Sequence, residues 1–271
     1  MIKVNNFSIG GNSPLVLIAG PCVIENEKVI LNTAEHIKKI TGDLNIPFIF
    51  KSSYKKANRT SIKSFSGIEF EKALSILEKV REKFSVPVLT DVHTEKEINS
   101  VARVADVIQI PAFLCRQTEL LIAAGKTGKI INVKKGQFLA PQDMKHVIEK
   151  IESTKNKKIM LTERGTTFGY HNLVVDMRSL AIMKKFGYPV IMDATHAVQL
   201  PSNTNVSGGD SEFIPILAKA AAAVGIDGLF LEVHPNPAEA KSDKASQLPL
   251  KQLKKLLLTI KHIDDLIKNE N

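Results

Sequence analysis

Short apolar runs alternate along the chain with longer segments in which apolar residues recur every three or four positions. The runs are apolar at consecutive positions, which is typical of parallel strands that are covered on both faces. In the longer segments, apolar residues at every third or fourth position are typical of amphipathic helices. Eight segments carry the strand pattern: residues 15–20, 48–53, 86–92, 107–112, 129–136, 159–165, 190–196 and 228–234.

Two of the intervening segments carry strong helix signals. Thr94 and Glu97 have the spacing of a capping box, immediately before an apolar-periodic stretch. Near the C-terminus, apolar residues at helical spacing form a single stripe and predict a long helix with one buried face. The stripe consists of Leu253, Leu256, Leu257, Ile260, Ile263 and Ile267.

Eight strand–helix units in about 250 residues predict an α/β fold of the (β/α)8 (TIM) barrel type. The alternation in residues 1–13 predicts an N-terminal β-hairpin that caps the bottom of the barrel. No linker-like stretch divides the chain, so we expect residues 1–271 to form a single domain. A doubly wound open sheet is the alternative, but such a sheet usually carries a glycine-rich phosphate loop after its first strand, and AGPCVIE is not one.

The chain is basic, with 37 Lys and Arg against 28 Asp and Glu and a formal charge of +9. Such a charge suits nucleic acid, a solvated basic surface or a pocket for small anions. Trp is absent and only three Tyr are present, so aromatic platforms for stacking bases are scarce. We therefore predict neither a nucleic-acid partner nor a membrane. Two cysteines and no signal-peptide or membrane-spanning run predict a cytoplasmic protein.

Polar residues gather where the predicted strands end. In a (β/α)8 barrel these positions form one mouth, where active sites lie. Several cations share this register, and such a cluster needs anions, which two phosphorylated small molecules would supply. The cations at the predicted mouth are Lys51, Lys56, Arg59, Arg116, Lys134, Lys135 and Arg164.

A second group of residues comes together if the barrel closes. Closure places the eighth strand beside the first and the seventh, so Cys22, His196 and Glu232 share one side of the mouth, with Asp243 in the following loop. A thiolate, an imidazole and two carboxylates suit a divalent ion such as Zn, Mn, Fe or Co. For Cys22 and Cys115, a buried structural thiol is the competing interpretation.

Other reaction types are less well supported. The chain has no nucleophile elbow, no Walker loop, no C-x-x-C and no H-E-x-x-H motif. A lysine-dependent aldolase stays open, because Lys51 or Lys134 would be placed to form a Schiff base.

Nine segments of the sequence resemble the family of 3-deoxy-D-manno-octulosonate 8-phosphate synthases. The resemblance runs from about residue 14 to about residue 250, and it is most specific in KANRTS and IQIPAFLCRQT. The related 3-deoxy-arabino-heptulosonate 7-phosphate synthases share the barrel but not this set of motifs. The segments are LIAGPCVIE, FKSSYKKANRTS, TDVH, IQIPAFLCRQT, NVKKGQFLAP, LTERGTTFGY, DATHAVQLP, GLFLEVHPNP and SDKASQLPL.

The resemblance implies a transferase that condenses phosphoenolpyruvate with D-arabinose 5-phosphate and water, on the route to lipopolysaccharide. It also implies a homotetramer. Phosphoenolpyruvate would be held by Lys51, Gln109, Lys134 and Arg164, and Lys56 would lie between the two substrates. The sugar phosphate would be contacted by Asn58, Arg59, Thr60 and Asp91. Arg116 would reach the sugar phosphate from a neighbouring subunit. The catalytic residues would be Lys51, Lys56, Asp91, Lys134 and His196.

The family has a metal-dependent branch and a metal-independent one, which carry Cys and Asn, respectively, at the position of Cys22. The cysteine and the segment SDKASQ around Asp243 resemble the metal-dependent branch. The resemblance therefore implies that Cys22, His196, Glu232 and Asp243 bind a divalent metal ion.

Overall fold

Eight parallel strands form a closed barrel in the computed structural model, which describes residues 1–59, 61–170, 172–200 and 208–269. The order around the barrel is β3-β4-β5-β6-β7-β8-β11-β14, and β14 pairs in parallel with both β11 and β3. The predicted (β/α)8 fold and all eight predicted strands are confirmed. Their bounds are β3 Val16–Gly20, β4 Phe48–Lys51, β5 Val88–Asp91, β6 Val107–Ile110, β7 Ile130–Lys134, β8 Ile159–Glu163, β11 Val190–Asp193 and β14 Gly228–His234.

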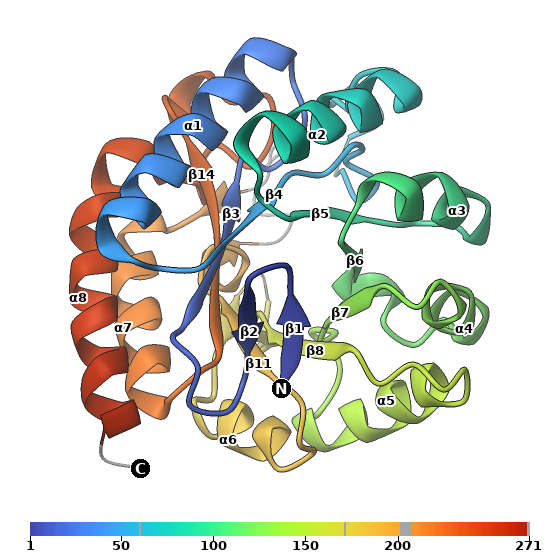
Figure 1. The fold of residues 1–271 in the computed structure, drawn as a ribbon, viewed down its shortest axis with the longest axis vertical. Coiled ribbons are helices and arrows are strands. Elements are labelled where there is room, and N and C mark those ends of the chain that lie inside the picture. Colours follow the sequence, from blue (N-terminus) through green and yellow to red (C-terminus); the bar gives the residue numbers. More distant parts are fainter. Residues whose placement is uncertain (60, 171, 201–207, 270–271) are drawn as a thin grey trace.

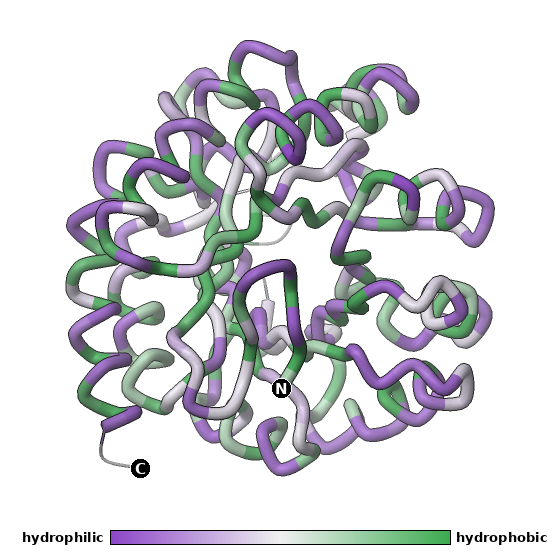
Figure 2. The backbone as a smooth tube through the Cα atoms, in the orientation of Figure 1, coloured by the Kyte–Doolittle hydropathy of each residue, from purple (hydrophilic) through white to green (hydrophobic). Residues whose placement is uncertain are grey.

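A ring of helices surrounds the strands (Figure 1), and each strand of the barrel is followed by a helix before the next. The helices are amphipathic, so hydrophilic and hydrophobic residues alternate along them (Figure 2). Their bounds are α1 Glu27–Leu44, α2 Phe70–Phe84, α3 Glu95–Val104, α4 Thr118–Lys126, α5 Met144–Glu152, α6 Arg178–Lys184, α7 Ile214–Val224 and α8 Leu250–Asn269.

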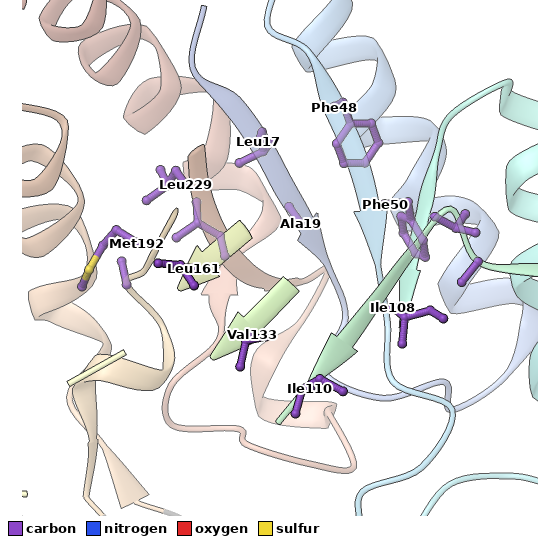
Figure 3. Packing of buried hydrophobic residues seen from close by; sticks show 14 of the residues in the cluster. Leu17, Ala19, Phe48, Phe50, Ile108, Ile110, Val133, Leu161, Met192 and Leu229 are labelled. Carbon is purple, nitrogen blue, oxygen red and sulfur yellow. The ribbon is translucent and has the colours of Figure 1, made fainter. Parts of the chain in front are cut away.

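The strands separate two apolar cores because successive side chains point to opposite faces. The larger core lies between strands and helices, and it includes Leu17, Val133 and Leu161 (Figure 3). The smaller one lies inside the barrel and contains inward-facing residues such as Ile49 and Phe230. The consecutive apolar positions of the strand pattern therefore serve two different cores.

The N-terminal hairpin consists of β1 (Ile2–Val4) and β2 (Phe7–Ile9), paired antiparallel. Its buried residues Ile2, Val4 and Ile9 belong to the same cluster as the inward-facing strand residues. The predicted hairpin is thus present, and it packs against the floor of the barrel interior.

Both helix signals are confirmed. The Glu97 carboxylate accepts the backbone N–H of Thr94 at 2.9 Å, as a capping box requires. In α8 the apolar stripe is buried or partly buried, but the buried face also holds Asp264, which the apolar pattern did not predict. The Asp264 carboxylate accepts the N–H of Leu15 at 2.8 Å and pairs with Lys268 at 2.6 Å, so α8 is joined to the chain just before β3.

The loops at the mouth contain short accessory elements. Two small antiparallel pairs, β9 with β10 and β12 with β13, follow β8 and β11, and β15 extends the sheet beside β14. In the described part of the chain, no helix is long and apolar enough to cross a membrane. The bounds are β9 Thr166–Thr167, β10 Leu173–Val174, β12 Gln199–Leu200, β13 Gly208–Gly209 and β15 Leu248–Pro249, with 3-10 turns η1 Ala112–Leu114, η2 Pro141–Asp143, η3 His196–Val198, η4 Ser211–Phe213 and η5 Pro237–Glu239.

Candidate active site

A cavity of about 380 Å³ opens at the mouth of the barrel. Residues from the ends of all eight barrel strands, or from the loops after them, line it. Most of the residues that the sequence singled out are among them: Cys22, Lys51, Lys56, Asn58, Asp91, Gln109, Lys134, Arg164, His196 and Glu232.

The two-residue period of the strands explains why charged side chains reach this cavity. In β4 the apolar Ile49 faces the barrel interior, so Lys51 faces it two residues later. The same step leads from Ile191 to Asp193 and from Phe230 to Glu232. In these three strands, therefore, a polar residue is stacked above an apolar floor.

Close packing of β3 against β4 places the Lys51 side chain beside the backbone of Cys22. A side chain at Gly20 is excluded, because its Cβ would lie 2.0 Å from the carbonyl oxygen of Lys51. The Lys51 ammonium donates to the carbonyl of Cys22 at 3.1 Å and pairs with the Glu232 carboxylate at 3.0 Å. Lys51 thus links β3, β4 and β14.

Four buried cations line the cavity, and their surroundings divide them into two pairs. Burial alone would lower the pKa of Lys51 and Lys56, but carboxylates raise it above the ordinary lysine value: chiefly Glu232 beside Lys51 and Asp243 beside Lys56. Burial lowers the pKa of Lys134, and it also lowers the pKa of Arg164. The positive charges of Lys134 and Arg164 are therefore less fully compensated than those of Lys51 and Lys56.

Lys134 belongs to a compact ion-pair group with Asp193 and His196. Its ammonium lies 2.6 Å from Asp193 Oδ2 and 4.0 Å from the centre of the Phe230 ring. His196 Nδ1 lies 2.8 Å from the same carboxylate oxygen. His196 Nδ1 also lies 3.3 Å from the Lys134 ammonium, and Nε2 faces Glu232 at 3.5 Å.

Three predicted metal ligands form a buried cluster. One ligand atom each of Cys22, Glu232 and Asp243 lies within 4.8 Å of the others. His196 Nε2 lies 3.9 Å from Asp243 Oδ2 but is not part of that group of three. Burial, and then the carboxylates of Asp243 and Glu232, raise the pKa of the Cys22 thiol well above its usual range.

The cluster fits a divalent cation by its donor chemistry. Glu232 Oε2 is buried and has no hydrogen-bond partner among the residues that the structure describes, although such an atom normally has one. Coulombic contacts with His196 and lysines outweigh burial and keep the pKa of Glu232 below its ordinary value, so the group is a carboxylate ready to bind a cation. A metal-binding His commonly has a carboxylate beside its other ring nitrogen, and Asp193 Oδ2 lies 2.8 Å from Nδ1 of His196.

A directional hydrogen-bonded chain crosses four strands beneath the cavity. Thr162 donates to Asn132 at 2.7 Å, Asn132 donates to Gln109 at 2.9 Å, and Gln109 donates to Asp91. Asp91 also accepts from Ser53, and the coulombic effect of Lys51 outweighs burial to lower its pKa. The amide nitrogen of Gln109 carries a second N–H, which can donate to a ligand in the cavity.

Gln199 connects Arg164 with the buried cluster that contains Asp243. Its carbonyl oxygen accepts from Arg164 Nη2 at 2.9 Å, and its amide nitrogen donates to Asp243 Oδ2 at 2.9 Å. The other terminal nitrogen of Arg164, Nη1, is buried and has no partner in the described residues. This N–H group is thus available to an anion.

Arg59, Arg116 and Asp243 are not among the residues that line the cavity. Arg59 is partly buried and approaches the carbonyl of Lys56 at 3.4 Å. Arg116 is exposed and does not line the cavity of its own chain. Thr60 lies outside the described residues.

The structure adds residues that the sequence did not assign to substrate or metal. His93 lines the cavity and lies 3.0 Å from the Tyr54 hydroxyl, and burial lowers its pKa. Phe230 contacts Lys134 from below, and Gln199 bridges two loops. The strand register would have identified Phe230 as inward-facing, two residues before Glu232. Gln199 had no such signal, because its role depends on the folding of a loop.

Comparisons with known proteins agree on one family. A family model described as the DAHP synthetase I family matches residues 1–269. The chain is 54% identical over 270 residues to a protein of Francisella tularensis subsp. holarctica named 2-dehydro-3-deoxyphosphooctonate aldolase, covering 99% of this chain and 98% of the relative. Proteins of the same name from Dichelobacter nodosus and Fusobacterium nucleatum are each 54% identical over 268 residues, which is 98% of this chain and 97% and 96% of theirs.

Proposed function

We propose that this chain, which belongs to the DAHP synthetase I family, condenses phosphoenolpyruvate with D-arabinose 5-phosphate and water. The products are 3-deoxy-D-manno-octulosonate 8-phosphate and inorganic phosphate, for lipopolysaccharide synthesis in the cytoplasm. The observation that carries the proposal is the convergence of four buried cations, Lys51, Lys56, Lys134 and Arg164, on one cavity. The names of the relatives support the choice of reaction.

Phosphoenolpyruvate would bind between Lys51, Lys134 and Arg164, assisted by an amide N–H of Gln109. The unpartnered Nη1 of Arg164 supports this assignment, because phosphate and carboxylate oxygens only accept hydrogen bonds. The lowered pKa of Lys134 supports it as well: its ammonium lacks full compensation, and a bound anion would supply it.

Arabinose 5-phosphate would bind at the outer side of the cavity. Asn58 lines that side, Arg59 and Thr60 follow it in the chain, and Asp91 would accept from a sugar hydroxyl. Arg116 is exposed on its own chain, which suits a contact with the substrate of a neighbouring subunit in a homotetramer.

The reaction joins a nucleophilic carbon to an aldehyde. C3 of phosphoenolpyruvate would attack the aldehyde carbon of the open-chain sugar, and positive charge would develop at C2. Water would add at C2, and phosphate would leave with cleavage of its C–O bond. Lys51, Lys56, Lys134 and Arg164 would hold the two anions together against their repulsion, which is catalysis by positioning and electrostatics.

A divalent ion would be held by Cys22, Glu232 and Asp243, with His196 as the fourth ligand. When bound, the ion would supply Lewis-acid polarisation of an oxygen in the cavity. The chain's own residues prepare the site: Asp193 holds the His196 ring with Nε2 toward the cluster, and Gln199 fixes one oxygen of Asp243. Because the pKa of Cys22 is raised, metal binding would release its proton.

A lysine-dependent aldolase is the second candidate, and the lowered pKa of Lys134 favours it. A Schiff-base lysine needs a neutral amine, which a lowered pKa helps to provide. Against it, the ammonium of Lys134 pairs with Asp193 at 2.6 Å. Borohydride with substrate would trap a Schiff base covalently, whereas the proposed condensation gives no adduct.

The deciding experiment is phosphate release from phosphoenolpyruvate with arabinose 5-phosphate. We expect release that stops in EDTA and returns with Mn or Zn. Activity unchanged in EDTA would contradict the metal site but keep the condensation. Faster release with a four-carbon sugar phosphate would indicate the related heptulosonate synthase instead, and no release with either sugar would refute the proposed reaction.

A further inference from the structure

We propose that a buried ion pair behind the cavity wall, Lys135 with Glu163, is a positioning device for the anion-binding side chains of that wall. The strand register places the pair on the outer side of the barrel: Val133 and Leu161, two residues earlier in each strand, belong to the core between strands and helices. The inference rests on the proposed function only in its choice of phosphoenolpyruvate as the anion.

Glu163 fixes the backbone from which Arg164 enters the cavity. Its Oε1 accepts the backbone N–H groups of Arg164 at 2.9 Å and Gly165 at 2.8 Å, and its Oε2 accepts from Ser179 of α6 at 2.5 Å. Gly165 has a φ of +91°, in the left-handed region that favours glycine. The carboxylate therefore closes a tight turn directly after β8 and ties it to a helix.

Lys135 joins the loop after β7 to the loop after β8. Its ammonium lies 3.5 Å from Glu163 Oε1 and donates to Thr166 Oγ1 at 2.9 Å. It also donates to the carbonyl oxygens of Leu139 at 3.2 Å and Gly136 at 3.3 Å. The side chain is fully buried, so these partners replace its hydration, and Glu163 supplies the compensating charge.

The pair lies directly behind two cations that carry the anion site. Lys134 precedes Lys135 in the chain, and Arg164 follows Glu163, so each member of the pair is one peptide unit from a cavity cation. Lys134 and Arg164 carry charges of the same sign and line the same cavity. A rigid support that holds the two cations in place before the anion binds removes the free-energy cost of positioning them during binding.

The test compares Ser179→Ala and Glu163→Gln with the unaltered protein in calorimetric titrations of phosphoenolpyruvate. We expect affinity to fall by about 10- to 100-fold in Glu163→Gln, the range seen for groups that orient a binding residue, and by less in Ser179→Ala. KM for phosphoenolpyruvate should rise in step, while KM for arabinose 5-phosphate should change less than about twofold. Ser153→Ala, which removes an exposed hydroxyl bonded to Lys150, is the matched control.

Unchanged affinity for phosphoenolpyruvate in a folded Ser179→Ala and Glu163→Gln would overturn the proposal. An equal loss for both substrates would also overturn it, because that pattern indicates general damage. If Glu163→Gln does not fold, Ser179→Ala alone decides between these results. Titration of inorganic phosphate needs no turnover, so the affinities of the variants can be compared even if the protein releases no phosphate from the two substrates. That failure would refute the proposed function, whereas the affinities would still test the positioning role of the ion pair.

Discussion

The two ends of the barrel are built from the same strands but hold opposite chemistry. At the floor, Ile9 of the hairpin packs with inward-facing residues such as Ile49 and Phe230 in an entirely apolar cluster. At the mouth, two residues further along the strands, Lys51 and Glu232 are just as buried. The floor gains stability by removing apolar surface from water, whereas the mouth holds buried charges around a cavity.

The difference shows how one scaffold separates stability from function. Several buried charges at the mouth have a partner of opposite sign, as Lys134 has Asp193 and Lys56 has Asp243. Such pairs add little net stability, but each strongly penalises the loss of one partner. We therefore expect changes at the mouth to affect binding and turnover, and changes at the floor to affect unfolding.

The largest expected effect is at the mouth, in Lys134→Met. The substitution removes one of the cations assigned to phosphoenolpyruvate, and a lost preorganised group of this kind lowers kcat by about 10²- to 10³-fold. Phosphate release measures it, and Lys157→Met, which removes an exposed lysine, is the control. A folded Lys134→Met with more than about a tenth of normal activity would contradict the role given to this lysine.

The next effect separates metal binding from the rest of the mouth. Cys22→Ala removes a thiol from the cluster with Glu232 and Asp243, so we expect a clear loss of bound Mn or Zn after dialysis. Metal content by elemental analysis is the readout, and it does not depend on turnover. Cys115→Ala is the matched control, because that thiol is buried in the core outside the cavity. Equal metal content in both variants would remove Cys22 from the site.

The contrast between floor and mouth also explains what the sequence could predict. The eight strands were recognisable because the apolar runs are local, and the polar residues that end them follow from a two-residue register. The bridge from Arg164 through Gln199 to Asp243 could not be predicted, because it joins three loops whose contacts depend on tertiary structure. The buried Asp264 was missed for the same reason: its partner Leu15 is 249 positions away.

At the floor, Ile9→Val should cost about 1 kcal/mol of unfolding free energy. Ile9 is completely buried between the hairpin and the barrel interior, so the lost methylene leaves a small cavity. Urea denaturation measures the change, and Lys3→Ala on the exposed side of the same hairpin should leave stability almost unaltered. The kcat of folded Ile9→Val should match that of the unaltered protein; a reduced kcat would mean that the floor and the mouth are coupled.

The smallest expected effect is the change of folding stability with pH, which has opposite signs at the two ends of the barrel. At the mouth, coulombic contacts with Lys51 outweigh burial and lower the pKa of Asp91, so the stability that it contributes is lost as the solution is acidified. Near the floor, burial raises the pKa of Asp227, although its carboxylate accepts the N–H of Val190 at 2.8 Å. The folded state then holds the proton of Asp227 more tightly than the unfolded state does, so this group's contribution falls as pH rises from its ordinary pKa through the raised one.

Asp227→Asn removes that titration and keeps an oxygen for the Val190 N–H. Relative to this variant, the unaltered protein should lose stability as pH rises through that window, and the difference should be constant at higher pH. Urea unfolding at a series of pH values from about 4 to 7 measures it, because the mouth carboxylates titrate in both proteins and cancel in the difference. Parallel stability curves would show that the environment of Asp227 does not favour its protonated form, and the contrast in sign between the two ends would not hold.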